Sequence, residues 1–238
     1  MENFRMPSNI TAPMSPTTAA ERVTAFLRAV YGWMCLGLAI TAVVAYEVAG
    51  SPAFLTRLVR TPGLFIVLIL TELGLVFYLS ARAARMAANT AMLLFVLYAA
   101  LNGVTLSFVL LAYTGESVAN AFVVTAGMFG AMALFGSTTR RSLAGFGQFL
   151  FMGLVGIVLA SLVGLFWHND ALQFVISVGG VIVFTGLAAW DAQRLKQMAL
   201  AVPVGRVGSM AIVGALALYL DFINLFLSLL TLFGNRRE

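Results

Sequence analysis

The stretch ALALYLDFINLFLSLLTLFG, residues Ala215 to Gly234, is an apolar run long enough to cross a lipid bilayer, and it contains one carboxylate, Asp221. A second acidic residue, Asp191, lies in the preceding segment FTGLAAWDAQRLK. An ionisable side chain at membrane depth is costly, so it usually faces the protein interior or water and marks a functional path. We therefore expect the other helices to enclose these two carboxyl groups.

The composition places the chain among membrane proteins. Hydrophobic residues make up 61% of the 238 residues, charged residues make up 10%, and the mean hydropathy is +1.00. A soluble core could not hide so much apolar surface, so we expect the lipid bilayer to act as solvent. The net charge of +5 comes from basic residues scattered in ones and twos, as topology signals are. We therefore expect no nucleic-acid partner, and we expect no cofactor.

Seven apolar runs predict an all-α protein with seven transmembrane helices. The runs cover residues 30–49, 64–80, 88–112, 118–135, 146–167, 172–190 and 208–233. We expect one domain over residues 22–238, preceded by a disordered polar tail at residues 1–21. Between the first two runs, Ser51 and Pro52 have the pattern of an N-cap and a first helical position. That pattern predicts a short helix at the membrane interface.

The basic residues also predict an orientation. If the N-terminus is cytoplasmic, ten basic residues fall on that side, namely Arg5, Arg22, Arg28, Arg82, Arg85, Arg140, Arg141, Arg194, Lys196 and Arg206. Four fall on the other side, namely Arg57, Arg60, Arg236 and Arg237. Positive residues collect in cytoplasmic loops, so we expect the N-terminus inside and the C-terminus outside.

The spacing of the two aspartates predicts that they meet. The turn between the last two helices is centred near residue 206, midway between Asp191 and Asp221. A hairpin closed there places both carboxyl groups about 15 to 20 Å from its tip, at 1.5 Å per residue. This geometry requires the sixth helix to continue past its apolar run to about Val202. Two carboxyl groups in contact repel each other when both are ionised, so the pair tends to share a proton near neutral pH.

Several nearby side chains are candidates to act with the pair. Arg82, or its rival Arg85, enters from the same side at the end of the second span and could bind the ionised aspartates. On the seventh helix, Asn224 and Ser228 follow Asp221 at i+3 and i+7, so oxygen atoms line one face. Such a stripe suits a hydrated hard cation such as calcium.

A second set of polar residues lies on the second and third spans. Tyr98, Asn102 and Thr105 recur at i, i+4 and i+7 on one helical face, and Glu72 lies near the middle of the second span. Asn102 and Glu72 are candidates for a cation pathway. Hydrogen bonding between helices is the alternative for the stripe, and Glu72 is a gate, a cation ligand or a packed hydrogen-bonding group.

Three segments and one residue resemble the bacterial branch of the Bax inhibitor-1 family, also called the transmembrane Bax inhibitor motif proteins. They are LYLDFINLFLSLLTLFG, the preceding GLAAWDAQRLK, YAALNGVTLS in the third span, and Glu72. The resemblance covers about residues 22–237. It implies a bacterial inner-membrane protein in which six helices wrap the seventh, and a pH-sensitive passive calcium leak.

The resemblance also implies roles for individual residues. Asp191 and Asp221 match the two aspartates of the family's pH sensor, and they are also the candidate calcium ligands. An arginine after the second helix locks the closed state in the family, and we prefer Arg82 over Arg85 for that role. The structural alternative for Asp191 is an i,i+3 ion pair with Arg194.

Two other classes of function compete with the leak. Paired intramembrane aspartates can form a protease, but Trp190 precedes Asp191 and Leu220 precedes Asp221, so the Tyr-Asp and Gly-Leu-Gly-Asp signatures are missing. We therefore expect no enzyme. The other class is a non-transporting regulator that acts through a partner, such as a membrane protease or a cell-death factor. Removing residues 1–18 separates the two, because an adaptor should lose function and a leak should keep its flux.

Overall fold

A computed structural model describes residues 16–82, 85–167 and 169–237. Seven helices within these ranges are long and apolar enough to cross a membrane. They are α1 (Pro16–Ala49), α3 (Pro62–Arg82), α4 (Ala88–Ala112), α5 (Gly115–Thr138), α6 (Ala144–Phe166), α7 (Asp170–Ala201) and α8 (Val207–Phe233). Two short helices connect them, α2 (Pro52–Arg60) and the 3-10 turn η2 (Val204–Arg206). The predicted polytopic all-α fold is confirmed.

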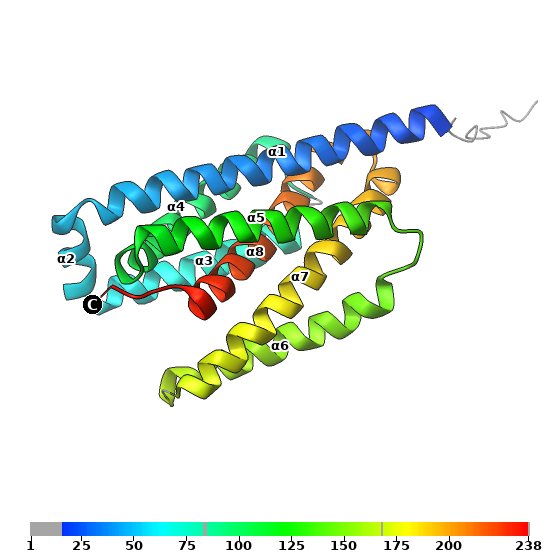
Figure 1. Ribbon diagram of the computed structural model, residues 1–238. Coiled ribbons are helices and arrows are strands. Elements are labelled where there is room, and N and C mark those ends of the chain that lie inside the picture. Colours follow the sequence, from blue (N-terminus) through cyan, green and yellow to red (C-terminus); the bar gives the residue numbers. More distant parts are fainter. Residues whose placement is uncertain (1–15, 83–84, 168, 238) are drawn as a thin grey trace, which may run out of the picture.

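The last helix, α8, forms the centre of the bundle (Figure 1). Of its most apolar segment 67% is buried, against 6% to 39% for the other six spans. It packs against α1, α4, α5 and α7, and more lightly against α3. The expectation that six helices surround it needs one correction, because α6 packs against α7 and lies at the edge of the bundle.

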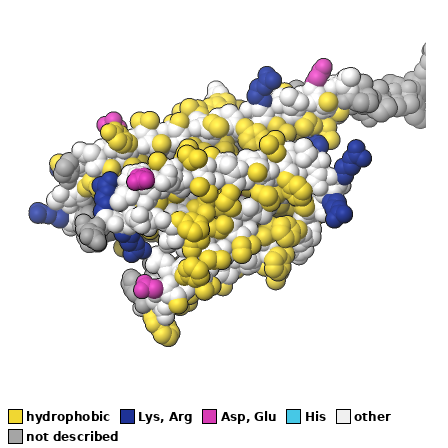
Figure 2. All heavy atoms as spheres, in the orientation of Figure 1, with side chains coloured by type: hydrophobic (Ala, Val, Ile, Leu, Met, Phe, Trp, Pro, Cys, Tyr) yellow, Lys and Arg dark blue, Asp and Glu magenta, His cyan; other side chains and the backbone are white. Residues whose placement is uncertain are grey.

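The outer surface of the bundle suits a lipid environment. Figure 2 shows apolar side chains across the middle of the visible face and charged side chains toward its two ends. Large apolar side chains with more than two-thirds of their surface exposed include Phe77, Leu93, Val123, Leu134 and Phe149. So much exposed apolar surface is costly in water, whereas lipid chains would cover it.

The hairpin of α7 and α8 follows the predicted geometry. Helix α7 continues past its apolar run to Ala201, the turn η2 follows, and α8 begins at Val207. The Arg22 guanidinium of α1 donates a hydrogen bond of 2.7 Å to the carbonyl oxygen of Val202, just after α7 ends. This bond satisfies a carbonyl group at the end of the helix and connects α1 to the hairpin.

Two local expectations differ from the structure. Helix α1 begins at Pro16, so residues 16–21 are helical rather than part of a disordered tail, and residues 1–15 lie outside the described residues. Good helix formers such as Ala19, Ala20 and Glu21 explain this earlier start. Ser51 does precede α2, yet its side chain caps no described backbone amide. Proline at the first helical position starts α2 without that bond.

The segment that follows α8 is fixed against the turn between α4 and α5. The Thr114 amide donates to the Asn235 carbonyl oxygen at 3.1 Å, and the Arg237 amide donates to the Ala112 carbonyl oxygen at 2.9 Å. These bonds enclose an antiparallel bridge between Tyr113 and Arg236. The last described residues therefore hold a defined position at the end of the bundle where α2 also lies (Figure 1).

Candidate functional site

The structure brings Asp191 of α7 and Asp221 of α8 together inside the bundle. Their carboxyl groups lie within hydrogen-bonding reach of each other. Only 8% of Asp191 and 6% of Asp221 is exposed. Each lies 15 residues from Arg206 in the turn. Because α8 is the central helix, the pair is surrounded by protein rather than by lipid.

Close helix packing next to the pair explains this burial. Gly136 of α5 lies against the backbone of Ala189 in α7, two residues before Asp191, and a methyl group on Gly136 would overlap that backbone. Gln193, two residues after Asp191 on α7, is also buried. Its side chain accepts a hydrogen bond from the Leu143 amide at 2.8 Å and donates to the Arg141 carbonyl oxygen at 2.9 Å. Both contacts restrain α7 against its neighbours.

The cation beside the pair is Arg194. Its Nη1 atom lies 3.8 Å from Oδ1 of Asp191, and its guanidinium lies 5.3 Å from the ring centre of Trp190. The structure therefore contains the i,i+3 ion pair that was the structural alternative for Asp191. Arg82 ends α3 and Arg85 follows it, and both side chains are exposed. Within the part of the chain that the structure describes, neither forms an ion pair with the aspartates.

Asp221 keeps an incomplete set of hydrogen bonds. Its Oδ2 atom is buried without a partner among the described residues, and so is Oγ1 of Thr185 on α7. Buried polar atoms are nearly always paired, so such exceptions call for an explanation. Thr185 was not predicted as a site residue. Its only sequence signal is one polar residue within an apolar run.

The predicted oxygen stripe continues from Asp221 along α8. Asn224 donates through Nδ2 to the Leu220 carbonyl oxygen at 2.8 Å, and Ser228 donates through Oγ to the Asn224 carbonyl oxygen at 2.7 Å. Both donors are thus used within α8. Ser228 packs against Gly180 of α7, where a methyl group would overlap its hydroxyl. The stripe therefore lies at the closed interface between α7 and α8.

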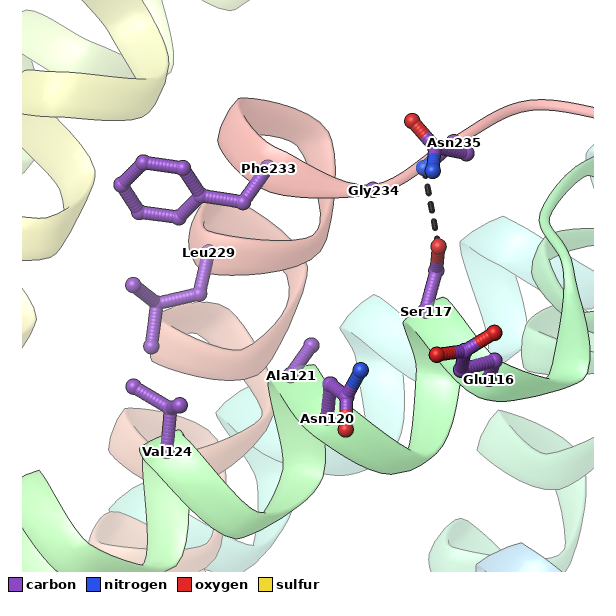
Figure 3. A pocket seen from close by; sticks show the side chains of 9 residues that line it. All are labelled: Glu116, Ser117, Asn120, Ala121, Val124, Leu229, Phe233, Gly234 and Asn235. Carbon is purple, nitrogen blue, oxygen red and sulfur yellow. Dashed lines mark hydrogen bonds between the residues drawn. The ribbon is translucent and has the colours of Figure 1, made fainter.

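A cavity of about 320 Å³ lies between the start of α5 and the end of α8 (Figure 3). Glu116, Ser117, Asn120 and Asn235 supply its polar lining, and its apolar lining includes Leu229, the neighbour of Ser228. The Asn235 amide donates to Oγ of Ser117 at 2.9 Å. The cavity therefore lies at the end of α8 toward which the oxygen stripe runs.

Glu72 and Asn102 lie in a different cluster. Thr105 donates to Glu72 at 2.5 Å, and Asn102 also forms a side-chain hydrogen bond with Glu72. The Tyr219 hydroxyl of α8 donates to Oδ1 of Asn102 at 3.0 Å, and it lies 2.7 Å from Oγ1 of Thr41 on α1. Four helices thus share one network, which matches the hydrogen-bonding alternative for the stripe on α4.

This network faces away from the aspartates. Tyr219 and Asp221 are two residues apart on α8, which corresponds to a rotation of about 200° around the helix axis. Sequence analysis missed Tyr219 and Thr41 as members of the network. A tyrosine two residues before the aspartate is a weak signal, because periodicity does not identify the helix that each face of α8 contacts.

Comparison with known proteins identifies the family of the chain. A family model described as "Inhibitor of apoptosis-promoting Bax1" matches residues 23–238. The chain belongs to the Bax inhibitor-1 family. Its relatives in the Bax inhibitor-1 family include the "Inner membrane protein YbhL" of Escherichia coli strain K12, which is 50% identical over 215 residues that cover 89% of this chain and 92% of the relative.

Another relative is an "Uncharacterized protein" of Borreliella burgdorferi, 43% identical over 215 residues that cover 90% of this chain and 93% of the relative. The region that matches the Bax inhibitor-1 family includes the aspartate pair, the oxygen stripe and the Glu72 network. Within the described residues, no group of three or more His, Cys, Asp or Glu side chains gathers at one place.

Proposed function

We propose that this protein is a pH-sensitive passive calcium leak of the membrane, gated by Asp191 and Asp221. The observation that carries the proposal is a pair of buried carboxyl groups in contact on α7 and the central helix, one of which keeps an oxygen atom without a partner among the described residues. Buried ionisable groups at membrane depth mark ion paths and proton relays. The family resemblance supports the same reading.

The proton shared by the pair is the proposed control. When both carboxyl groups are ionised, they repel each other and attract Arg194, which lies beside Asp191. Protonation of one group weakens that attraction. We infer that Arg194 takes the role expected of Arg82 or Arg85, and that protonation lets the two carboxyl groups share a proton and frees Arg194 from Asp191. Flux should therefore be higher at about pH 6 than at about pH 8.

The proposed route follows oxygen atoms along the interface of α7 and α8. It passes from Asp221 by Thr185, Asn224 and Ser228 toward the cavity that Glu116 lines. Carboxylate, amide and hydroxyl oxygens are the ligands that calcium prefers. A set with only two clustered carboxylates suits passage better than tight binding, because each additional carboxylate raises the affinity for calcium.

The test is calcium influx into proteoliposomes between about pH 6 and about pH 8, with the unmodified protein, Asp221→Asn and Asp191→Asn. The proposal predicts a pH-dependent influx that both substitutions flatten. Asp170→Asn is the matched control, because Asp170 is an exposed acid in the first turn of α7. Equal and negligible influx for all four proteins would reject the leak, and so would a flattened response in the control.

A non-transporting regulator is the second candidate, and the family description favours it because it names inhibition of another protein. Deletion of residues 1–15 tests this candidate without shortening α1, which begins at Pro16. An adaptor that uses this segment loses function after the deletion, whereas a leak keeps its calcium flux. The readout is influx together with recovery of the same amount of folded protein.

We also propose an inner-membrane location with a cytoplasmic N-terminus and an outer C-terminus. The relative named an inner membrane protein supports the location, and the ten-to-four distribution of basic residues supports the orientation. Reporter fusions after Arg237 and within the loop after Thr138 test the orientation. A reporter active outside the cell at Arg237 and inside at the loop is expected, and the reverse pattern would overturn it.

A further inference from the structure

A second cavity, of about 510 Å³, lies at the end of the bundle where the chain ends. The end of α1 contributes Tyr46 and Glu47, the end of α4 contributes Leu110 and Leu111, and Arg237 comes from the C-terminal segment. The cavity is separate from the aspartate pair and from the cavity that Glu116 lines. Its wall contains both polar and apolar residues.

The cavity carries two opposite charges that do not neutralise each other. Glu47 and Arg237 both line it, and among the described residues they form no ion pair with each other. The backbone of Arg237 is held in place, because its amide donates to the Ala112 carbonyl oxygen at 2.9 Å. A ligand that contacts both side chains needs an anionic group for Arg237 and a cationic group for Glu47.

The rest of the wall is suited to a lipid. Leu110, Leu111 and Val118 are apolar, and Tyr46 has 75% of its surface exposed beside them. Tyrosine is typical of the boundary between lipid chains and head groups, because it has an apolar ring and a polar hydroxyl. Val43, one turn before Glu47 on α1, is 62% exposed and extends the apolar surface toward the middle of the helix. An exposed tyrosine beside exposed apolar side chains is the pattern expected where lipid head groups and acyl chains meet.

We propose that this cavity binds a zwitterionic phospholipid whose head group carries a primary amine. The Arg237 guanidinium would bind the lipid phosphate, which matches its planar set of donors. The Glu47 carboxylate would accept a hydrogen bond from the lipid ammonium group. A quaternary ammonium group has no N–H to donate, and a glycerol head group has no positive charge. The cavity therefore favours phosphatidylethanolamine over phosphatidylcholine and phosphatidylglycerol.

The test measures lipid retained by the purified full-length protein in detergent, by native mass spectrometry, with the three lipids at equal concentration and with identical acyl chains. The expected result is a preference of about threefold to tenfold for phosphatidylethanolamine over each of the others. Water-soluble glycerophosphoethanolamine, added in excess, should not displace the lipid if the apolar wall contributes. Equal retention of all three lipids, or full displacement by the soluble head group, would overturn the proposal.

Matched variants assign the effect to this cavity. Glu47→Gln should remove the preference over phosphatidylcholine, and Arg237→Gln should weaken retention of all three lipids. Glu116→Gln and Arg57→Gln are the controls, because Glu116 lines the other cavity and Arg57 is an exposed arginine of α2. The proposal fails if Glu116→Gln changes lipid retention as much as Glu47→Gln does, or if Arg57→Gln changes it as much as Arg237→Gln does. The result does not depend on calcium flux, so it is independent of the proposed leak.

Discussion

Two polar centres share the central helix, and they are built differently. On one side of α8, the hydroxyl of Tyr219 contacts Thr41 and Asn102, and the network extends to Glu72. On the other side, Asp221 faces Asp191 and keeps one oxygen atom without a partner among the described residues. Both centres lie inside the same bundle, so burial alone does not explain the difference between them.

The contrast separates a structural role from a functional one. A network in which each buried polar atom has a partner stabilises one arrangement of helices. On the Asp221 side, one buried oxygen atom has no partner among the described residues, and two carboxyl groups repel each other when both are ionised. This side therefore stabilises the packing of the helices less, and a proton or a cation can change its contacts. We therefore assign helix packing to the Tyr219 side, while the proposed gating rests on the Asp221 side.

The largest effect on stability should come from Tyr219→Phe. This change leaves Thr41 and Asn102 with one partner fewer and should lower the free energy of unfolding by about 1 to 2 kcal/mol. The pH dependence of calcium flux should stay unchanged. Unfolding in mixed micelles measures the first quantity, and Tyr46→Phe is the control because Tyr46 is 75% exposed. If Tyr219→Phe loses the pH response of calcium flux, the two sides of α8 do not have separate roles.

Asp221→Asn should show the opposite pattern. The amide of Asn can donate to Asp191 at any pH, so the contact no longer needs a shared proton. The free energy of unfolding should change by less than about 1 kcal/mol, while the ratio of calcium flux at about pH 6 to that at about pH 8 falls to near one. A large loss of stability with an intact flux ratio would instead make Asp221 a packing residue.

Glu72→Gln tests the packing role of the Tyr219 side of α8. The amide oxygen of Gln can still accept from Thr105, so the free energy of unfolding should fall by no more than about 0.5 to 1 kcal/mol. Flux should respond to pH as in the unmodified protein. If Glu72→Gln reduces calcium flux severalfold without loss of stability, Glu72 belongs to the cation pathway and both sides of α8 are functional.

The smallest effect should come from Arg194→Gln. Arg194 is 56% exposed and lies 3.8 Å from Asp191, so solvent screens its charge. Its removal makes ionisation of the pair harder, and the midpoint of the flux response should move to higher pH by a few tenths of a unit. Arg82→Gln is the control and should leave the midpoint in place. If only Arg82→Gln shifts the midpoint of the flux response, Arg82 is the arginine that acts with the aspartate pair, as the sequence analysis preferred.

Sequence analysis located the aspartate pair because the pair depends on local features. The spacing of Asp191 and Asp221 around residue 206 and the antiparallel order of consecutive helices were enough to predict that the two residues meet. The arginine that acts with the aspartate pair was harder to identify from the sequence. Arg82 and Arg194 are both near the end of a span, and only the path of α3 shows that Arg82 remains exposed away from the pair.

The sequence by itself determined the membrane class, the seven spans, the long α7 and α8 hairpin and the family. These follow from hydropathy, segment length and turn residues, which are properties of short stretches of chain. The i,i+3 pair of Asp191 with Arg194 is also local to one helix. Only the tertiary structure decided that Arg82 forms no ion pair with the aspartates among the described residues, that Tyr219 connects Glu72 to α1, and that α6 lies at the edge. Those contacts depend on how each helix is rotated about its axis and which neighbours it meets, and packing of the whole bundle sets both.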